Sequence, residues 1–215
     1  MENTYEKIYE DKNIIVVSKK ESVLVIKGRG SLSAEENLYE KLNKEYGKIF
    51  VVHRIDRDTS GVLVFAKDKQ THRELSIMFE KRLIDKRYLA VVYGNFKEKF
   101  LSVDLPIREY GSQRMGVSQN GKPATTEFRL IKNLDNNLSL IEAKPITGRR
   151  HQIRVHLYHI GYPIVGDKLY GRVKDRENKY GRMMLHCFKL EFTLFGKKYS
   201  FEEKESFLKI CFSSL

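Results

Sequence analysis

The sequence has few cysteines, few prolines and no long apolar run, and each scarcity narrows the class of protein. Cys187 and Cys211 are the only cysteines, which is too few for a disulfide framework or a zinc site. No apolar segment approaches the roughly 18 residues that a membrane-spanning helix needs. The N-terminus, Met-Glu-Asn-Thr-Tyr-Glu-Lys, is polar and partly acidic, unlike a signal peptide. We therefore expect a cytoplasmic protein in a reducing environment, with no membrane attachment.

Linkers, repeats and cofactor motifs are also missing. No Pro/Ser-rich stretch divides the 215 residues, so we expect a single domain over residues 1–215. Gly28 and Gly30 form a weak glycine loop that lacks the Walker lysine and the full Rossmann fingerprint, so no nucleotide cofactor is expected. The six histidines are scattered without clustered carboxylates, which predicts no metal. Nothing in the chain resembles a dimer seam, and we expect a monomer.

Positive charge is what the chain has in excess. Its formal net charge is +12, and residues 144–182 hold ten basic and three acidic residues. A surplus of this size favours a polyanionic partner such as nucleic acid, although a generally lysine-rich surface would give the same total. Charge alone says nothing about chemistry.

Apolar periodicity predicts a mixed α+β fold. Strands are expected at residues 14–17, 23–26, 87–93, 125–131, 138–143 and 184–195. Between two of these strands lies a long polar loop, residues 108–122, which is either a solvated excursion or an RNA-gripping element. We expect a mixed, mostly antiparallel sheet with flanking helices.

Capping signals locate three helices. The first is expected to open with a capping box at Ser33 and Glu36, to bury Leu38, Leu42 and Tyr46, and to end at Gly47. The second is capped by Asp68 and is expected to bury four apolar side chains: Leu75, Met78, Phe79 and Leu83. The third should run from near Arg149 to Gly161, with one face formed by Arg150, Arg154, Leu157 and Tyr158.

A charged turn between two apolar runs carries the strongest signal for chemistry. Residues 53–61 read His-Arg-Ile-Asp-Arg-Asp-Thr-Ser-Gly, which predicts strand, turn, strand. Asp56, placed between Arg54 and Arg57, should stay ionised and could act as a nucleophile or a base. Taken alone, such a pattern is more often a solvated surface salt bridge. Asp58 is the obvious competitor, since Asp56 and Asp58 would point the same way in an extended segment.

Further segments give this turn a context. Residues 144–157 read Lys-Pro-Ile-Thr-Gly-Arg-Arg-His-Gln-Ile-Arg-Val-His-Leu, and residues 86–94 read Lys-Arg-Tyr-Leu-Ala-Val-Val-Tyr-Gly. Two later blocks are Gly161–Asp167 and Met184-Leu185-His186. In their order and spacing, these segments and the turn resemble the RluA-type pseudouridine synthases, which convert uridine in RNA to its carbon-linked isomer. The resemblance runs from about residue 8 to about residue 203.

The resemblance implies a fold, a reaction and roles for individual residues. RNA would bind in a cleft across the sheet, and the essential aspartate would be Asp56. Tyr88 matches the tyrosine that stacks on the target base, Arg154 the arginine that pairs with the catalytic carboxylate, and Leu185 an apolar residue on the other side of the base. Arg54 would fill the stack that the flipped uridine vacates, or would contact a phosphate. The remaining motif residues are expected to bind substrate: His53, Thr59, Arg149, Arg150, His151 and Gln152.

The resemblance also shows departures and leaves alternatives open. The catalytic-type strand begins near Ile8, so we expect the catalytic domain without the N-terminal RNA-binding module of many relatives. Lys19-Lys20 replaces the usual Lys-Pro, which makes the path of residues 19–31 uncertain. The carboxylate could add to the uracil ring, trap the sugar or take a proton from it. A catalytically silent RNA-binding or assembly protein is the alternative function, and a metal-dependent nuclease using Asp56 and Asp58 is a third.

Overall fold

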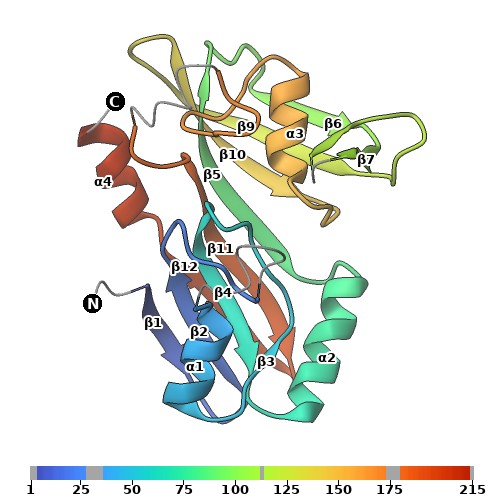
Figure 1. Cartoon of the computed structure of the whole chain (residues 1–215), viewed down its shortest axis with the longest axis vertical. Coiled ribbons are helices and arrows are strands. Elements are labelled where there is room, and N and C mark those ends of the chain that lie inside the picture. Colours follow the sequence, from blue (N-terminus) through green and yellow to red (C-terminus); the bar gives the residue numbers. More distant parts are fainter. Residues whose placement is uncertain (1–3, 28–35, 112–113, 173–179, 214–215) are drawn as a thin grey trace. The chain divides into compact units, whose positions relative to one another are not determined.

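The computed structural model describes residues 4–27, 36–111, 114–172 and 180–213. Its backbone packs as two compact units: the first holds residues 1–85 and 187–203, and the second holds residues 86–186 and 204–215. Each unit combines helices with mostly antiparallel strands (Figure 1), which confirms the predicted α+β class. The single domain over residues 1–215 stays a prediction.

The first unit is built around β4 (Ser60–Ala66), in which every residue is buried. Strand β2 (Ile14–Lys19) pairs antiparallel with one edge of β4, and β1 (Tyr5–Glu10) pairs antiparallel with β2. The short β3 (Phe50–Val51) also pairs with β4. In the strand order of the sheet, β4 lies between β2 and β11 (Leu185–Leu194). Strand β12 (Lys197–Glu202) pairs antiparallel with β11. Apolar side chains from β2, β4, β11 and β12 form the core of this unit.

Two helices complete the first unit, and their N-termini test the capping predictions. Helix α1 (Leu38–Tyr46) is capped by Asn37, whose Oδ1 accepts a hydrogen bond from the Glu40 N–H at 3.0 Å. The helix therefore starts later than the capping box predicts, and Ser33 lies outside the described residues. Gly47 ends the helix at φ 76°, as predicted. Helix α2 (Lys69–Glu80) confirms the predicted cap, because Asp68 Oδ1 accepts from the Thr71 N–H at 2.9 Å.

Two predictions about apolar residues in this unit are wrong. Residues 23–26 form no strand, because their carbonyl groups have other donors. The first N–H groups of α1 donate to Leu24 and Val25, and the buried Lys19 ammonium donates to Val23. Leu83 lies beyond the end of α2 and is 61% exposed, so it is not on the buried face of that helix.

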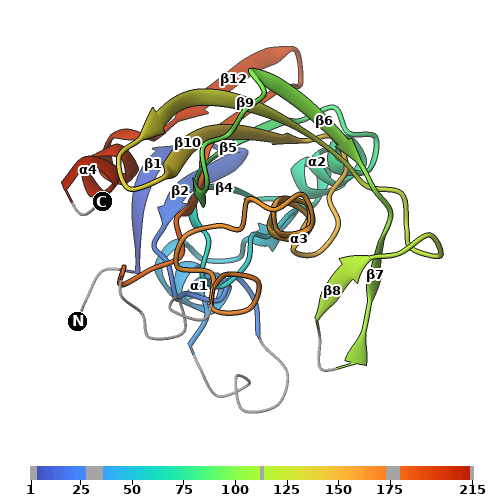
Figure 2. The same ribbon diagram turned by 90° about the horizontal axis from the view of Figure 1, so that it is seen from above.

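The second unit is an antiparallel sheet that arches over a helix. Its strands follow the order β5 (Asp85–Tyr93), β10 (Leu138–Pro145), β9 (Thr125–Leu134), β6 (Phe100–Asp104). Helix α3 (Gln152–His159) lies beneath the arch (Figure 2), and Gly161 follows it in a left-handed conformation as predicted. Helix α4 (Glu205–Ser213) belongs to the same unit, where His186 stacks on its Phe207.

The predicted polar loop at residues 108–122 is a structured hairpin. Strand β7 (Ile107–Glu109) pairs antiparallel with β8 (Met115–Val117). A small core holds the hairpin against α3, in which Ile107, Met115 and Val117 pack with Val155 and Tyr170. This core comes from residues distant in sequence, which is why local polarity gave the wrong prediction.

None of the helices in the described part of the chain is both long and apolar enough to span a lipid bilayer.

Gly61 offers a test of this packing. A Cβ at this residue would lie 2.2 Å from the Cys187 carbonyl oxygen, and its φ of +120° disfavours a side chain. Gly61→Ala should therefore lower the free energy of unfolding by more than about 3 kcal/mol, since β11 backbone must move away from β4. Gly196→Ala is the matched control: its φ is +77° but nothing lies within 4 Å of the added Cβ. We expect a loss of only about 1–2 kcal/mol there. Urea unfolding of both variants measures the difference; equal losses would contradict the clash.

Candidate active site

Asp56 begins a tight turn that joins β3 to β4. Its carbonyl oxygen accepts a hydrogen bond from the Thr59 N–H at 3.2 Å, which closes a four-residue turn. Thr59 is buried, Asp56 is partly buried, and Arg54 and Arg57 are exposed. The predicted strand–turn–strand arrangement is therefore correct, and it mounts a carboxylate on a buried strand.

The turn separates the two competing aspartates. Asp56 is the first residue of the turn and Asp58 is its third, so the segment is not extended at this point. The expectation that Asp56 and Asp58 point the same way holds only for an extended segment, so it does not apply to this turn. The two carboxylates stand at different positions of the turn and can be tested separately.

Two side chains hold the turn from within the first unit. The Lys19 ammonium, 1% exposed, donates to the carbonyl oxygens of Lys20, Val23 and Arg57 at 2.8, 2.9 and 2.9 Å. His53 Nε2 accepts from the Val64 N–H at 3.1 Å, and its ring stacks on Phe79 at 4.4 Å between centroids. The sequence analysis missed this role of Lys19. Its burial could have been read from the alternation of Ile15, Val17 and Lys19 along β2.

Gln152 organises the start of α3 in the second unit. Its Oε1 accepts from the Thr147 hydroxyl at 2.6 Å and from the Arg149 N–H at 2.9 Å. Its Nε2 donates to the Thr125 carbonyl and to the Thr126 hydroxyl at 2.9 and 3.0 Å. A side-chain amide has two donors and two principal acceptor sites, so this protein network uses all four. Gln152 was predicted to bind substrate, but these contacts give it a structural task.

His156 extends this network through the interior of the second unit. Its Nε2 must donate to the Leu105 carbonyl oxygen, 2.9 Å away, because a carbonyl only accepts. In the neutral ring, Nδ1 then accepts from the Thr126 hydroxyl at 2.9 Å. Burial lowers the pKa of His156 below its usual 6.5, which favours this neutral form.

Arg154 is fixed by a partner that the sequence analysis did not assign. Its Nε and Nη2 donate to the two carboxylate oxygens of Asp167 at 2.8 and 2.9 Å, and the two residues are 5% and 1% exposed. Burial opposes ionisation of Asp167, but the Arg154 guanidinium and the backbone N–H groups of Leu169 and Tyr170 hold its pKa below the usual value. The Gly161–Asp167 block contained the only signal for this pair.

The other motif residues before α3 make contacts within the same unit. Arg149 Nε donates to the Pro123 carbonyl at 3.0 Å, and Arg150 forms an ion pair with Glu109 of β7 at 3.0 Å. His151 adopts a left-handed conformation with φ 54°, and its Nδ1 lies 2.8 Å from the Tyr170 hydroxyl. These contacts hold the start of α3 against the hairpin.

Tyr88 lies on the face of the second sheet that α3 covers. Tyr88 and Phe128 both stand opposite Ala143 in the strand register, so the three side chains share one face. Thr126, two residues before Phe128, points to the same face and contacts Gln152 of α3. Tyr88 is 9% exposed and Leu185, at the start of β11, is 3% exposed.

The predicted site residues thus fall into two groups. Asp56 and Thr59 lie on the turn of the first unit, and His53 and Arg54 lie just before it. The second unit brings together the start of α3 and places Tyr88 on the same face of its sheet; this group comprises Tyr88, Arg149, Arg150, His151, Gln152, Arg154 and Leu185. Among the described residues, no three His, Cys, Asp or Glu side chains gather as a metal site requires.

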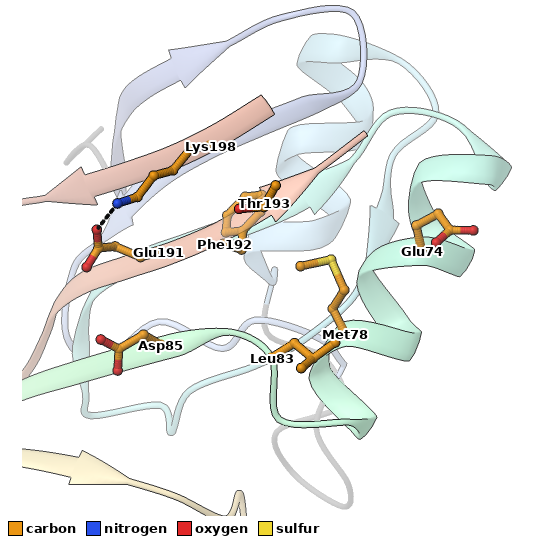
Figure 3. A pocket seen from close by; sticks show the side chains of 8 residues that line it. All are labelled: Glu74, Met78, Leu83, Asp85, Glu191, Phe192, Thr193 and Lys198. Atoms are coloured by element: carbon orange, nitrogen blue, oxygen red, sulfur yellow. Dashed lines mark ion pairs between the residues drawn. The ribbon is translucent and has the colours of Figure 1, made fainter. Parts of the chain in front are cut away.

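A hollow in the first unit is distinct from both groups. This open pocket of about 500 Å³ lies between α2, β11 and β12 (Figure 3). Its lining consists of Glu74, Met78, Leu83, Asp85, Glu191, Phe192, Thr193 and Lys198. The lining carries three carboxylates and one ammonium, and Lys198 lies 4.0 Å from Glu191. This lining is unsuited to a polyanion, and it includes no predicted site residue.

Comparison with known proteins identifies the family. A family model described as RNA pseudouridylate synthase matches residues 13–159, which include the Asp56 turn, Tyr88 and Arg154. The chain therefore belongs to the RNA pseudouridylate synthase family.

Individual relatives agree with this assignment. The chain is 40% identical over 196 residues to the ribosomal large subunit pseudouridine synthase D of Borreliella burgdorferi, covering 86% of this chain and 60% of that protein. It is 34% identical over 205 residues to the dual-specificity RNA pseudouridine synthase RluA of Escherichia coli, covering 93% of each. Among solved structures, human RNA pseudouridylate synthase domain containing 1 matches with a TM-score of 0.80 at 27% identity, covering 93% of this chain and 82% of that one.

Replacing Lys19 tests its hold on the turn. Lys19→Met removes an ammonium that satisfies three carbonyl groups, and we expect a loss of roughly 1–3 kcal/mol in the free energy of unfolding. The turn at Arg57 should also shift, which would reduce any activity of Asp56 by about tenfold or more. Lys20→Met is the matched control, because Lys20 is exposed. Urea unfolding and product formation measure both effects; equal behaviour of the two variants would contradict an anchoring role.

The buried histidine predicts a pH dependence. Because the pKa of His156 is lowered in the folded state, the unfolded chain binds the proton first as the pH falls. The stability contribution should be complete above about pH 6.5 and should decline below it. Urea unfolding at pH 7.5 and 5.5 measures the decline. His156→Gln should show a smaller decline between these pH values than the wild type; an identical decline would assign it to other groups.

Proposed function

We propose that this protein isomerises specific uridines in structured RNA to pseudouridine, with Asp56 as the essential carboxylate. The observation that carries the proposal is the family match over residues 13–159, within which Asp56 begins a hydrogen-bonded turn that leads into the buried strand β4. The substrate would be ribosomal RNA, transfer RNA or both; the name of the Borreliella relative specifies the large ribosomal subunit, and that of the Escherichia coli relative specifies dual specificity for RNA. We further propose that the enzyme acts in the cytoplasm as a monomer and needs no metal or cofactor.

The reaction needs a base that is removed from its stack. The bond from the sugar to the uracil nitrogen breaks, the uracil turns, and a ring carbon forms the new bond to the sugar. A proton then leaves that carbon and the released ring nitrogen gains one, so the product is an isomer of the substrate. Flipping the uridine costs a few kcal/mol, and we propose that Arg54 fills the vacated stack or holds a phosphate. Its exposure on the turn supports either role.

Tyr88 and Arg154 would act with Asp56. A phenol face suits a ring that must turn within its plane, and stacking contributes roughly 1–3 kcal/mol. Tyr88 lies on the face of the sheet that α3 covers, and Arg154 belongs to α3, which supports this role. Arg154 presents Nε and Nη2 to Asp167, and we propose that this oriented guanidinium serves the Asp56 carboxylate in the reaction. Leu185 would pack on the opposite side of the base.

The structure of the second unit also supports an RNA-contacting hairpin. Tyr110 is 48% exposed and the Arg108 guanidinium lies 6.0 Å from its ring centroid. Tyr158 of α3 is 49% exposed, with the Arg114 guanidinium at 6.0 Å. Aromatic rings beside cations suit nucleotides, which present both a π-face and a phosphate. The β7–β8 hairpin would therefore contact RNA that flanks the target.

Asp56→Asn tests the proposal. Wild-type protein incubated with unmodified transcripts of large-subunit ribosomal and transfer RNA should form pseudouridine at discrete positions, detected by chemical mapping. Asp56→Asn should bind the same RNA but form product more than about a thousandfold more slowly, because the amide is neither a nucleophile nor a base. Asp58→Asn, with the same change in charge, should retain activity.

Each other outcome is informative. No product from the wild type on any transcript, despite tight binding, would favour the silent RNA-binding alternative. Magnesium-dependent shortening of the RNA would favour a nuclease. Loss of activity in Asp58→Asn with activity retained in Asp56→Asn would move the role to Asp58.

A further inference from the structure

Tyr170 occupies the meeting point of the hairpin, α3 and the buried ion pair. It is 1% exposed and belongs to the small core that Ile107, Ala124 and Val155 form. Two guanidinium groups lie close to its ring, that of Arg154 at 5.0 Å and that of Arg114 at 5.4 Å from the centroid. The sequence analysis gave this residue no role.

The hydroxyl and the backbone N–H of Tyr170 contact different parts of the second unit. Its hydroxyl oxygen accepts from the Met115 N–H of β8 at 2.9 Å and lies 2.8 Å from His151 Nδ1 at the start of α3. Its backbone N–H donates to Asp167 Oδ1 at 3.0 Å. Arg154 Nη2 donates to that same carboxylate oxygen at 2.9 Å. Tyr170 thus links the hairpin both to the start of α3 and to Asp167, the ion-pair partner of Arg154.

The backbone conformation of His151 indicates that its contact with Tyr170 constrains the start of α3. A histidine with φ 54° is unusual, since a left-handed backbone is unfavourable for residues with a side chain. No side-chain hydrogen bond caps α3 at His151, so its ring is directed instead to the Tyr170 hydroxyl. A displacement of β8 that moved the Tyr170 hydroxyl would therefore act on the first turn of α3, which carries Arg154.

We propose that Tyr170 is a positioning residue that couples the β7–β8 hairpin to Arg154. RNA that engages the hairpin stabilises the arrangement of Met115, Tyr170 and His151 in which Arg154 is correctly oriented. The inference rests on the proposed function, because it assumes that the hairpin contacts RNA and that Arg154 serves the reaction. It adds a reason for the enzyme to act only on RNA that occupies the hairpin.

Tyr170→Phe tests the coupling with the smallest possible change. The variant keeps the ring close to both guanidinium groups and loses only the hydroxyl. We expect the single-turnover rate constant on a responsive transcript to fall about tenfold, while the Kd for that transcript changes less than about twofold. The urea midpoint should shift by less than roughly 1 M. Tyr162→Phe is the matched control, since its ring packs on Phe96 and its hydroxyl makes no hydrogen bond to the described residues.

A double-mutant cycle separates coupling from independent effects. Arg114→Ala should slow the single-turnover step at least fivefold in the wild-type background but less than about twofold in Tyr170→Phe, because the path to Arg154 is already broken. Rate effects that multiply independently would overturn the coupling, as would an unchanged rate in Tyr170→Phe or a failure of that variant to fold. Absence of product from the wild type would instead overturn the proposed function.

Discussion

The buried pair of Arg154 and Asp167 is the interaction on which the second unit depends. Removing both charges from water costs several kcal/mol per ion, and two parallel charge-assisted hydrogen bonds offset that cost only with accurate geometry. Asp167 also accepts backbone N–H groups from Leu169 and Tyr170, so the carboxylate fixes the chain that follows it. The guanidinium therefore has one orientation, and α3, the segment 161–170 and the hairpin are arranged around it.

The family motif in this chain encodes architecture as much as chemistry. Gln152 saturates its amide within the protein, and His53 uses Nε2 on the backbone of β4. Lys19 uses its ammonium on three carbonyl groups, one of them in the Asp56 turn. Such residues hold the backbone around a few reactive groups and so fix the geometry of those groups. Fixed geometry of this kind is how preorganisation lowers a barrier. A motif residue beside a catalytic one is thus often a support.

Local pattern predicted those parts of the fold that local physics decides. Alternation found β5, β9, β10 and β11, and the Asp68 cap is correct. The errors arise where distant groups satisfy the backbone. Residues 23–26 read as a strand, yet α1 and Lys19 take their carbonyl groups. Residues 108–122 read as a loop, yet Tyr170 supplies a hydroxyl and a ring to β8. The candidate residues could be named from the motifs, whereas the partner of Arg154 required the fold.

The arginine side chains of the second unit differ in how firmly the protein holds them. Arg154 is buried and neutralised, so its direction is set before any RNA binds. Arg108 lies beside the ring of Tyr110, and Arg114 lies beside the ring of Tyr158 of α3. These contacts hold the guanidinium groups less firmly than an ion pair does, which suits contact with a flexible polyanion. A guanidinium that serves a reaction gains from a fixed position, because reorientation during the reaction would add to the barrier. One that attracts RNA needs only to be near it, since attraction to phosphates acts over several ångströms. Tyr170 contacts both Arg114 and Arg154, so with the roles proposed above it would link RNA binding to the reaction.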